Sequence, residues 1–270
     1  MRLHVNPATT GWLWVKAGVR TFWRQPLAMS GLFFMFMVVV SLLSMLPMVG
    51  TAVAMALVPA ATLGLMAATR EADQGRFPMP SVLVTAFRGG PARRQAMLVL
   101  GGLYAVSLLL VITVSSLFMG DIPAPVPDGT EVSAEAMSAA MNRPGVWIAM
   151  LLYLPVMMAF WHAPPLVFWH GVKPAKSLFF SLVACWGNKG ALLVFTLGWV
   201  CVFIVVGVAL GALGSLLGGP QAMQVVLYPI VLFMASMFHT SLWFTFRDSF
   251  RFDEGETALE SGTAPPPSDP

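Results

Sequence analysis

The chain has 270 residues, of which 57% are hydrophobic and only 10% are charged. Soluble domains carry charge on about a quarter of their residues, so this composition excludes a cytosolic enzyme, a disordered chain and a secreted disulfide scaffold. The net charge is +3, and the two cysteines, Cys185 and Cys201, match no metal-binding spacing. We therefore expect a lipid bilayer to be the main solvent of this protein.

Six segments lack Asp, Glu, Lys and Arg and are long enough to cross a bilayer, whose hydrocarbon core of ~30 Å needs about 20 apolar residues. In chain order they cover about 27–48, 49–68, 96–118, 146–169, 190–217 and 222–246. Prolines and glycines at 46–50 and 218–221 predict tight turns within the first and last pairs. The sequence therefore predicts an all-α, polytopic membrane protein with six transmembrane helices arranged as three hairpins.

The basic residues indicate how these spans are oriented. Fourteen of the 15 Lys and Arg fall before span one, between spans two and three, between spans four and five, or after span six. The segment between spans three and four holds only Arg143 and four acidic residues. Because cytoplasmic loops carry the excess of Lys and Arg, we predict a bacterial inner-membrane protein with both termini in the cytoplasm.

The remaining segments complete the predicted organisation. Residues 1–252 form a single integral-membrane domain, with 119–145 as its outer loop and a short surface helix over 133–141. Residues 253–270 are acidic and then rich in proline, without apolar periodicity, so we expect a disordered cytoplasmic tail.

Three cytoplasmic segments share one plan, a short helix followed by a basic or Gly/Pro turn and then a span. The helices are predicted over 10–24, 80–87 and 174–186. Five apolar residues of the first share one face: Trp12, Val15, Val19, Phe22 and Trp23. Such a face suits a helix lying in the membrane interface. The pattern indicates a threefold repeat of interfacial helix and hairpin, although any six-span protein with basic inner loops would resemble it.

Basic side chains in these segments are candidates for contact with anionic lipid. Lys16, Arg20 and Arg24 recur every four residues along the edge of the first helix, from which they would extend toward lipid phosphates. A second basic cluster follows the helix at 80–87 and consists of Arg88, Arg93 and Arg94. Because orientation alone requires basic inner loops, no nucleic-acid partner is predicted.

Small residues and prolines inside the spans concern helix packing and shape. Gly207, Gly211 and Ser215 form a stripe in the fifth span that would let another helix approach closely. We favour a partner helix within the chain over one from another subunit. Prolines of the return spans are candidate kinks, because proline removes a helical hydrogen bond; they are Pro59, Pro164, Pro165 and Pro229.

Two histidines within the spans, His162 and His239, could ligate haem or a metal, or relay a proton. The interpretation we favour is that both are hydrogen-bonded structural histidines. The methionines are scattered as packing residues. The sequence holds no HExxH, GxSxG or Walker A motif and no acidic pair within a span, so we predict no cofactor, no metal site and no catalytic residue.

Two stretches carry a resemblance to a known family. They are APPLVFWHGVKPAKSLFFSLVACWGN at 163–188 and the segment from Gly11-Trp12 to Gln25-Pro26. Together they resemble an uncharacterised family of bacterial six-span inner-membrane proteins, over about residues 10–247. That family is distantly similar to the membrane domain attached to some glycerophosphodiester phosphodiesterases. The resemblance implies a fold but no catalytic residue, because the soluble phosphodiesterase domain has no counterpart here.

Three functions are consistent with the sequence. We favour a structural, accessory or lipid-interacting membrane protein without catalytic activity, which contacts anionic lipids and for which a membrane-protein partner or a second copy is a further candidate. The alternative is a transporter or channel for a small uncharged or amphipathic substrate, supported by prolines at equivalent positions of the return spans. A haem- or quinone-linked redox subunit would depend on His162 and His239 alone.

Overall fold

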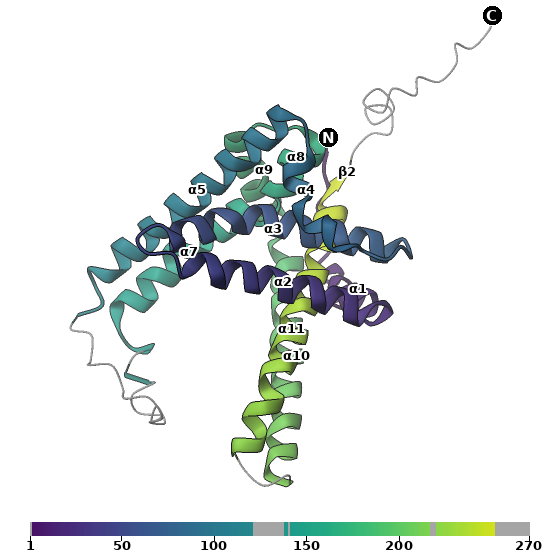
Figure 1. The fold of residues 1–270 in the computed structure, drawn as a ribbon, viewed down its shortest axis with the longest axis vertical. Helices are drawn as coiled ribbons and strands as arrows, with labels where there is room; N and C mark the ends of the chain where they lie inside the picture. Colours follow the sequence, from purple (N-terminus) through teal and green to yellow (C-terminus); the bar gives the residue numbers. More distant parts are fainter. Residues whose placement is uncertain (1, 121–137, 140, 217–219, 252–270) are drawn as a thin grey trace, which may run out of the picture. The chain divides into compact units, whose positions relative to one another are not determined.

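The computed structural model describes residues 2–120, 138, 139, 141–216 and 220–251, and most of these lie in helices (Figure 1). The elements in chain order are β1 (Arg2–Leu3), α1 (Thr10–Arg24), α2 (Pro26–Ser44), α3 (Gly50–Asp73), the 3-10 helix η1 (Pro80–Val84), α4 (Thr85–Arg88), α5 (Pro91–Ser116), α7 (Pro144–Trp161), α8 (Ala163–His170), α9 (Pro174–Gly187), α10 (Lys189–Leu216), α11 (Pro220–Ser249) and β2 (Phe250–Arg251).

Six helical segments of the described chain are long and apolar enough to cross a membrane. They are Pro26–Ser44, Gly50–Asp73, Pro91–Ser116, Pro144–His170, Lys189–Gly214 and Pro229–Ser249. The all-α fold with six candidate spans is therefore confirmed. One difference matters below: α3 does not end near Ala68 but continues to Asp73, and Gly75, with φ of +77°, follows its end. Glycine readily adopts this left-handed conformation, which commonly ends a helix.

The contacts of the chain define two compact units, which we describe separately. Unit 1 comprises Met1–Phe34, Leu65–Val82 and Val183–Pro270. Unit 2 comprises Met35–Gly64 and Leu83–Leu182. The single domain expected over 1–252 stays a prediction.

In unit 1, α1 packs against both α10 and α11, which lie side by side (Figure 1). Trp14 is buried in this contact, and its ring meets that of Phe195 edge to face, with centroids 6.2 Å apart. The helices also approach through small residues, because a Cβ on Gly18 would come within 2.5 Å of the Ser241 Cβ. The first helix is therefore seated closely on two candidate spans.

The buried face of α1 agrees only in part with the predicted face. Val15 and Phe22 are buried, but Trp12 and Trp23 are exposed and Val19 is half-buried. Because α1 contacts two helices at short range, its buried face also contains glycines, a threonine and a tryptophan, namely Gly11, Gly18, Thr21 and Trp14. A search for a purely apolar face misses such a surface.

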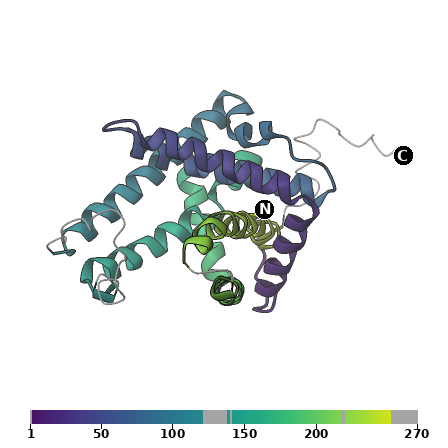
Figure 2. The same cartoon turned by 60° about the horizontal axis from the view of Figure 1, so that its bottom comes forward.

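Unit 2 is built around α5, which packs against α7 and α8 (Figures 1 and 2). Its hydrophobic core takes Leu63 from α3, Leu100 from α5 and Ala163 from α8, all fully buried. Tyr104 and Phe160 add an edge-to-face pair with centroids 5.0 Å apart. The candidate spans of this unit are thus joined by ordinary apolar packing.

The fourth span is interrupted at His162, where α7 ends and α8 begins. The backbone N–H of His162 donates to the Ser181 Oγ over 2.9 Å, and the Ser181 hydroxyl donates to the Met158 carbonyl over 2.7 Å. Pro164 and Pro165 lie in the first turn of α8, where the missing N–H groups are harmless. A serine from α9 therefore satisfies two backbone groups at the break.

The other two return spans are not broken at their prolines. Helix α3 continues through Pro59 and α11 continues through Pro229. A long helix flanked by apolar contacts tolerates the loss of one hydrogen bond. Whether either helix is kinked stays a prediction.

The predicted short segments are helical where the structure describes them. Helix α9 covers Pro174–Gly187, close to the expected range, whereas residues 80–88 begin as the 3-10 helix η1 and end in the single turn α4. Most of the helix expected over 133–141, and all of the tail expected over 253–270, lie outside the described residues.

Candidate functional site

The exposed side of α1 carries a row of cations. Lys16, Arg20 and Arg24 are all exposed, while the opposite side of the helix is buried against α10 and α11. The Lys16 ammonium lies 5.6 Å from the ring centroid of Trp12, which is itself exposed. Because one face of α1 is fixed by packing, the cationic row is held in place.

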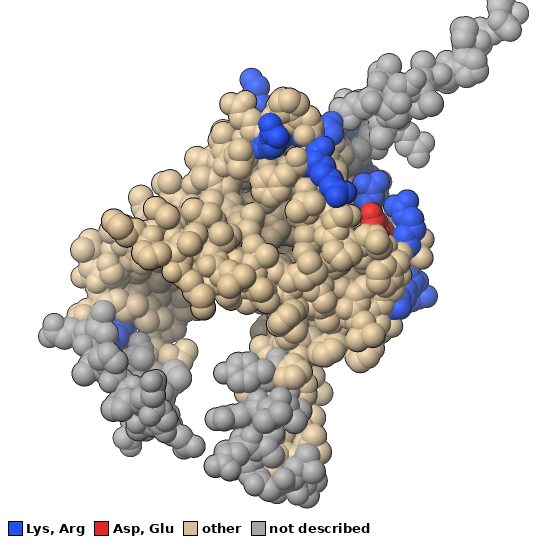
Figure 3. All heavy atoms as spheres, in the orientation of Figure 1, with Lys and Arg blue, Asp and Glu red and all other residues tan. Residues whose placement is uncertain are grey.

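This row forms one wall of a pocket of about 290 Å³ within unit 1. The other walls come from the ends of α3 and α11. The lining residues are Leu13, Lys16, Ala17, Arg20, Thr21, Arg24, Asp73, Phe244 and Arg247. In Figure 3, blue basic side chains lie around a small red area on the right of the view, just above the place where Figure 1 draws α1. We call this hollow the basic pocket.

Asp73, the last residue of α3, is the acidic side chain that lines the basic pocket. Its two carboxylate oxygens lie 3.8 Å from an Arg24 Nη and 3.6 Å from an Arg247 Nη. Arg24 also donates to the Asp73 backbone carbonyl over 3.2 Å. These groups are partly exposed, so the ion pairs orient the arginines more than they stabilise the fold.

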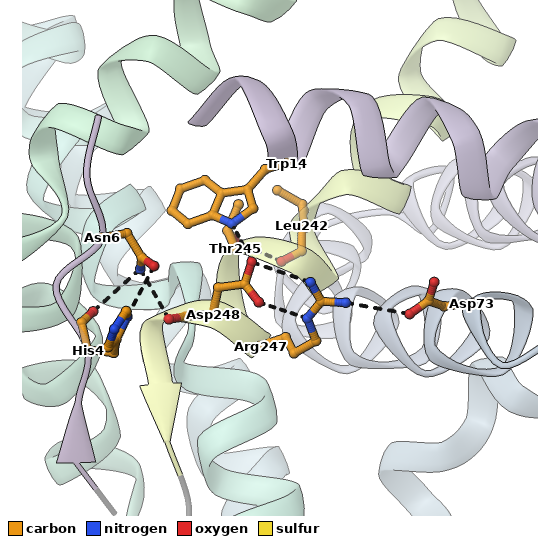
Figure 4. Close-up of polar contacts among 8 residues, drawn as sticks. All are labelled: His4, Asn6, Trp14, Asp73, Leu242, Thr245, Arg247 and Asp248. Atoms are coloured by element: carbon orange, nitrogen blue, oxygen red, sulfur yellow. Dashed lines mark hydrogen bonds and ion pairs between the residues drawn. The ribbon is translucent and has the colours of Figure 1, made fainter. Parts of the chain in front are cut away.

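Arg247 is held from its other side by Asp248 (Figure 4). The Arg247 Nε donates to the Asp248 Oδ1 over 2.8 Å, and the indole Nε1 of Trp14 donates to the Asp248 Oδ2 over 2.9 Å. Asp73, Arg247, Asp248 and Trp14 therefore form a continuous chain of contacts from the pocket to the buried face of α1.

The N-terminal segment is joined to the same end of α11. Asn6 donates from its backbone N–H and from Nδ2 to the Oδ1 of buried Asn188, over 2.7 and 3.0 Å, and from Nδ2 to the Asp248 carbonyl over 3.1 Å. Strands β1 and β2 then pair antiparallel, with Leu3 opposite Phe250. These bonds fix the segment before α1 against the ends of α10 and α11.

The chain is 38% identical over 260 residues to probable inner membrane protein BTH_II0599 of Burkholderia thailandensis, an alignment that covers 94% of this chain and 96% of that protein. The chain belongs to this family of inner membrane proteins. No family model matches the chain, and no solved structure matches it. An inner-membrane location therefore follows from the relative and from the six candidate spans.

The two predicted basic clusters belong to different compact units. Lys16, Arg20 and Arg24 line the basic pocket of unit 1. Arg88, Arg93 and Arg94 lie in unit 2, at the end of α4 and in the first turn of α5, and all three are exposed. Lipid contact at this second cluster stays a prediction.

The charged residues of the basic pocket that the sequence did not single out are Asp73 and Arg247. They lie 174 positions apart in the numbering of the chain and meet because α3 and α11 both end beside α1. Each is a charged residue just beyond an apolar run, which is the usual composition of a span terminus. Their pairing is visible only in three dimensions.

The two candidate histidines lie in different units and are described separately. In unit 1, the His239 Nδ1 makes a 2.9 Å hydrogen bond with the Ala235 carbonyl of its own helix, and its ring packs on Phe33 with centroids 4.9 Å apart. In unit 2, His162 is buried at the break between α7 and α8. Both positions fit structural histidines, and a role for either in cofactor binding stays untested.

The small-residue stripe of α10 makes no close approach at its two glycines among the described residues. A Cβ on Gly207 or Gly211 would meet no atom within 4 Å, and the Ser215 side chain lies outside the description. The preference for an intrachain partner of this stripe stays a prediction. Close helix approach occurs instead at Gly11, where a Cβ would lie 2.0 Å from the Ala191 carbonyl oxygen.

Proposed function

We propose that this inner membrane protein has a non-catalytic, lipid-interacting role, and that it binds the headgroups of anionic lipids on the cytoplasmic side. The observation that carries the proposal is the basic pocket, in which four cations face a single lining carboxylate. An anionic headgroup is the natural complement of such a site at the surface of a membrane protein.

The depth of the pocket relative to the spans supports this proposal. Asp73 is the last residue of one candidate span, and Arg247 lies near the end of another. Lipid phosphates occupy the same level of a bilayer, just outside the hydrocarbon. Exposed Trp12 and Trp23 on α1 suit that level too, because tryptophan is enriched at membrane interfaces.

The distribution of charge in unit 1 supports the proposed orientation. Residues 190–246 of α10, α11 and their connection contain no Lys, Arg, Asp or Glu, whereas Lys189 and Arg247 flank this stretch. The basic ends of the two helices are adjacent, because α10 and α11 pack together and the N-terminal segment binds to both. By the positive-inside rule this end is cytoplasmic.

We also propose a distant similarity to the membrane domain of some glycerophosphodiester phosphodiesterases. A membrane domain that binds phospholipid headgroups without hydrolysing them would suit such a relationship. The absence of catalytic activity is part of what we propose and rests on the lack of catalytic motifs in the sequence.

Thermal unfolding of the full chain in mild detergent tests the proposal. Added phosphatidylglycerol should raise Tm by about 5–10 °C at a hundredfold excess over Kd, since a ligand that binds only the folded state stabilises it by about 2.7 kcal/mol. Phosphatidylethanolamine, which carries no net charge, should leave Tm within about 1 °C. Equal stabilisation by both lipids would contradict a preference for anionic headgroups.

A further inference from the structure

The four cations of the basic pocket are not equally available to a ligand. Arg24 and Arg247 face Asp73, and Arg247 also donates to Asp248. Two carboxylates thus offset the charge of these two arginines. Among the described residues, Lys16 and Arg20 have no acidic partner within 4 Å. Within the part of the chain that the structure describes, the pocket therefore offers two positive charges without an acidic partner, both from α1.

These two charges are spaced along one helix edge. Residues four apart on a helix are separated by about 6 Å along its axis. Lys16 is further fixed by its position over the Trp12 ring. One phosphodiester group carries a charge of −1 and can neutralise only one of these two cations, whereas two linked phosphodiester groups can neutralise one each.

The size of the pocket limits what else it can hold. Its volume of about 290 Å³ is at the lower end of ligand pockets, which are about 300–1,000 Å³. It suits a compact polar headgroup, with acyl chains remaining along the spans. Leu13, Ala17 and Phe244 add apolar lining beside the charges, which can contact the carbon atoms next to a lipid's phosphate.

Building on the proposed function, we infer that the basic pocket is selective for a phospholipid headgroup with two phosphodiester groups, the chemistry of cardiolipin. Lys16 and Arg20 each bind one phosphate. Asp73 and Asp248 offset the charges of Arg24 and Arg247, so that the pocket matches a headgroup charge of −2. It also disfavours a zwitterionic headgroup, because the carboxylate that would bind an ammonium group is already shared by two arginines.

Lipid binding to the full chain in mild detergent tests this inference, with cardiolipin and phosphatidylglycerol titrated separately and complexes counted by native mass spectrometry. The wild type should bind cardiolipin about fivefold more tightly than phosphatidylglycerol, since each basic residue near a lipid surface contributes a factor of about five to the affinity. The double variant Lys16→Gln, Arg20→Gln should bind cardiolipin about 30-fold more weakly and should no longer distinguish the two lipids. Both side chains are exposed, so the fold should be retained.

Two further variants keep the result independent of general charge or folding effects. Lys173→Gln with Lys176→Gln removes two exposed cations outside the pocket, one of them similarly placed on an aromatic ring, and should change cardiolipin binding less than twofold. Asp73→Asn removes the neutralising carboxylate and should strengthen binding of both lipids about fivefold. A misfolded protein would instead bind both lipids more weakly.

The possible failures are distinguishable. Equal affinity for cardiolipin and phosphatidylglycerol in the wild type would overturn the two-phosphate inference and leave anionic-lipid binding intact. Binding of neither lipid would contradict the proposed function itself. If pyrophosphate alone stabilised the protein as strongly as cardiolipin, the site would be one for soluble diphosphates, and the lipid assignment would be overturned.

Discussion

The indole of Trp14, in the first helix of the chain, donates a 2.9 Å hydrogen bond to the carboxylate of Asp248, 234 positions further along. This bond joins the buried face of α1 to the end of α11. Because Asp248 also holds Arg247, the same bond connects the packing of α1 to a wall of the basic pocket. The following predictions test parts of this arrangement.

Replacing Trp14 by phenylalanine should lower the free energy of unfolding by about 1–3 kcal/mol. The ring would still fill most of the buried space, but the Asp248 carboxylate, a charged acceptor, would lose the hydrogen bond that the Trp14 indole donates. Denaturant titration in detergent measures the change. Trp12→Phe is the matched control, because Trp12 is exposed. Its replacement should lower the free energy of unfolding by less than about 0.5 kcal/mol. Equal losses for both variants would contradict the role of the bond.

Gly18→Ala should destabilise the protein by about 1–3 kcal/mol, because its Cβ would lie 2.5 Å from the Ser241 Cβ and force α1 away from α11. Gly207→Ala is the control. Nothing within 4 Å would meet its Cβ in the described chain, so the better helix propensity of alanine should leave stability unchanged or raise it by about 0.5–1 kcal/mol. A clear loss of stability or of oligomeric state in Gly207→Ala would instead indicate that this stripe contacts another subunit.

Asn188→Ala should loosen the segment that precedes α1. The buried Asn188 amide accepts two hydrogen bonds from Asn6 and donates to the His4 carbonyl. Hydrogen exchange should therefore become faster over residues 2–8, and global stability should fall by about 1–3 kcal/mol. Asn142→Ala, at an exposed position, should change neither quantity. Unaltered exchange in Asn188→Ala would show that the segment is held by other contacts.

The predicted orientation can be tested with fusions to the full chain. Green fluorescent protein attached after residue 270 should fluoresce, and alkaline phosphatase at the same position should be inactive, because the C-terminus is predicted to be cytoplasmic. Alkaline phosphatase inserted within the predicted outer loop should be active. The reverse pattern would place the basic pocket on the outer side and would contradict its proposed access to cytoplasmic-leaflet lipid.

The sequence predicted the six spans because their signal is local: long apolar runs without charge. It also predicted α1 and its cationic edge, since Lys16, Arg20 and Arg24 recur at helical spacing. Asp73 was missed because α3 continues past the apolar run, and Arg247 because a charge at a span end is unremarkable by itself. The ends of α3 and α11 meet beside α1 because of close contacts such as that of Gly18 with Ser241. No local sequence pattern encodes such contacts.

The central claim is that anionic lipid binds in the basic pocket, and phospholipid retained by the purified protein tests it most directly. The protein is washed extensively in mild detergent, and bound phospholipid is quantified for the wild type, for Lys16→Gln with Arg20→Gln, and for Lys173→Gln with Lys176→Gln. The wild type and the Lys173/Lys176 variant should retain anionic lipid, whereas the Lys16/Arg20 variant should lose most of it. Equal retention by all three proteins would contradict the claim.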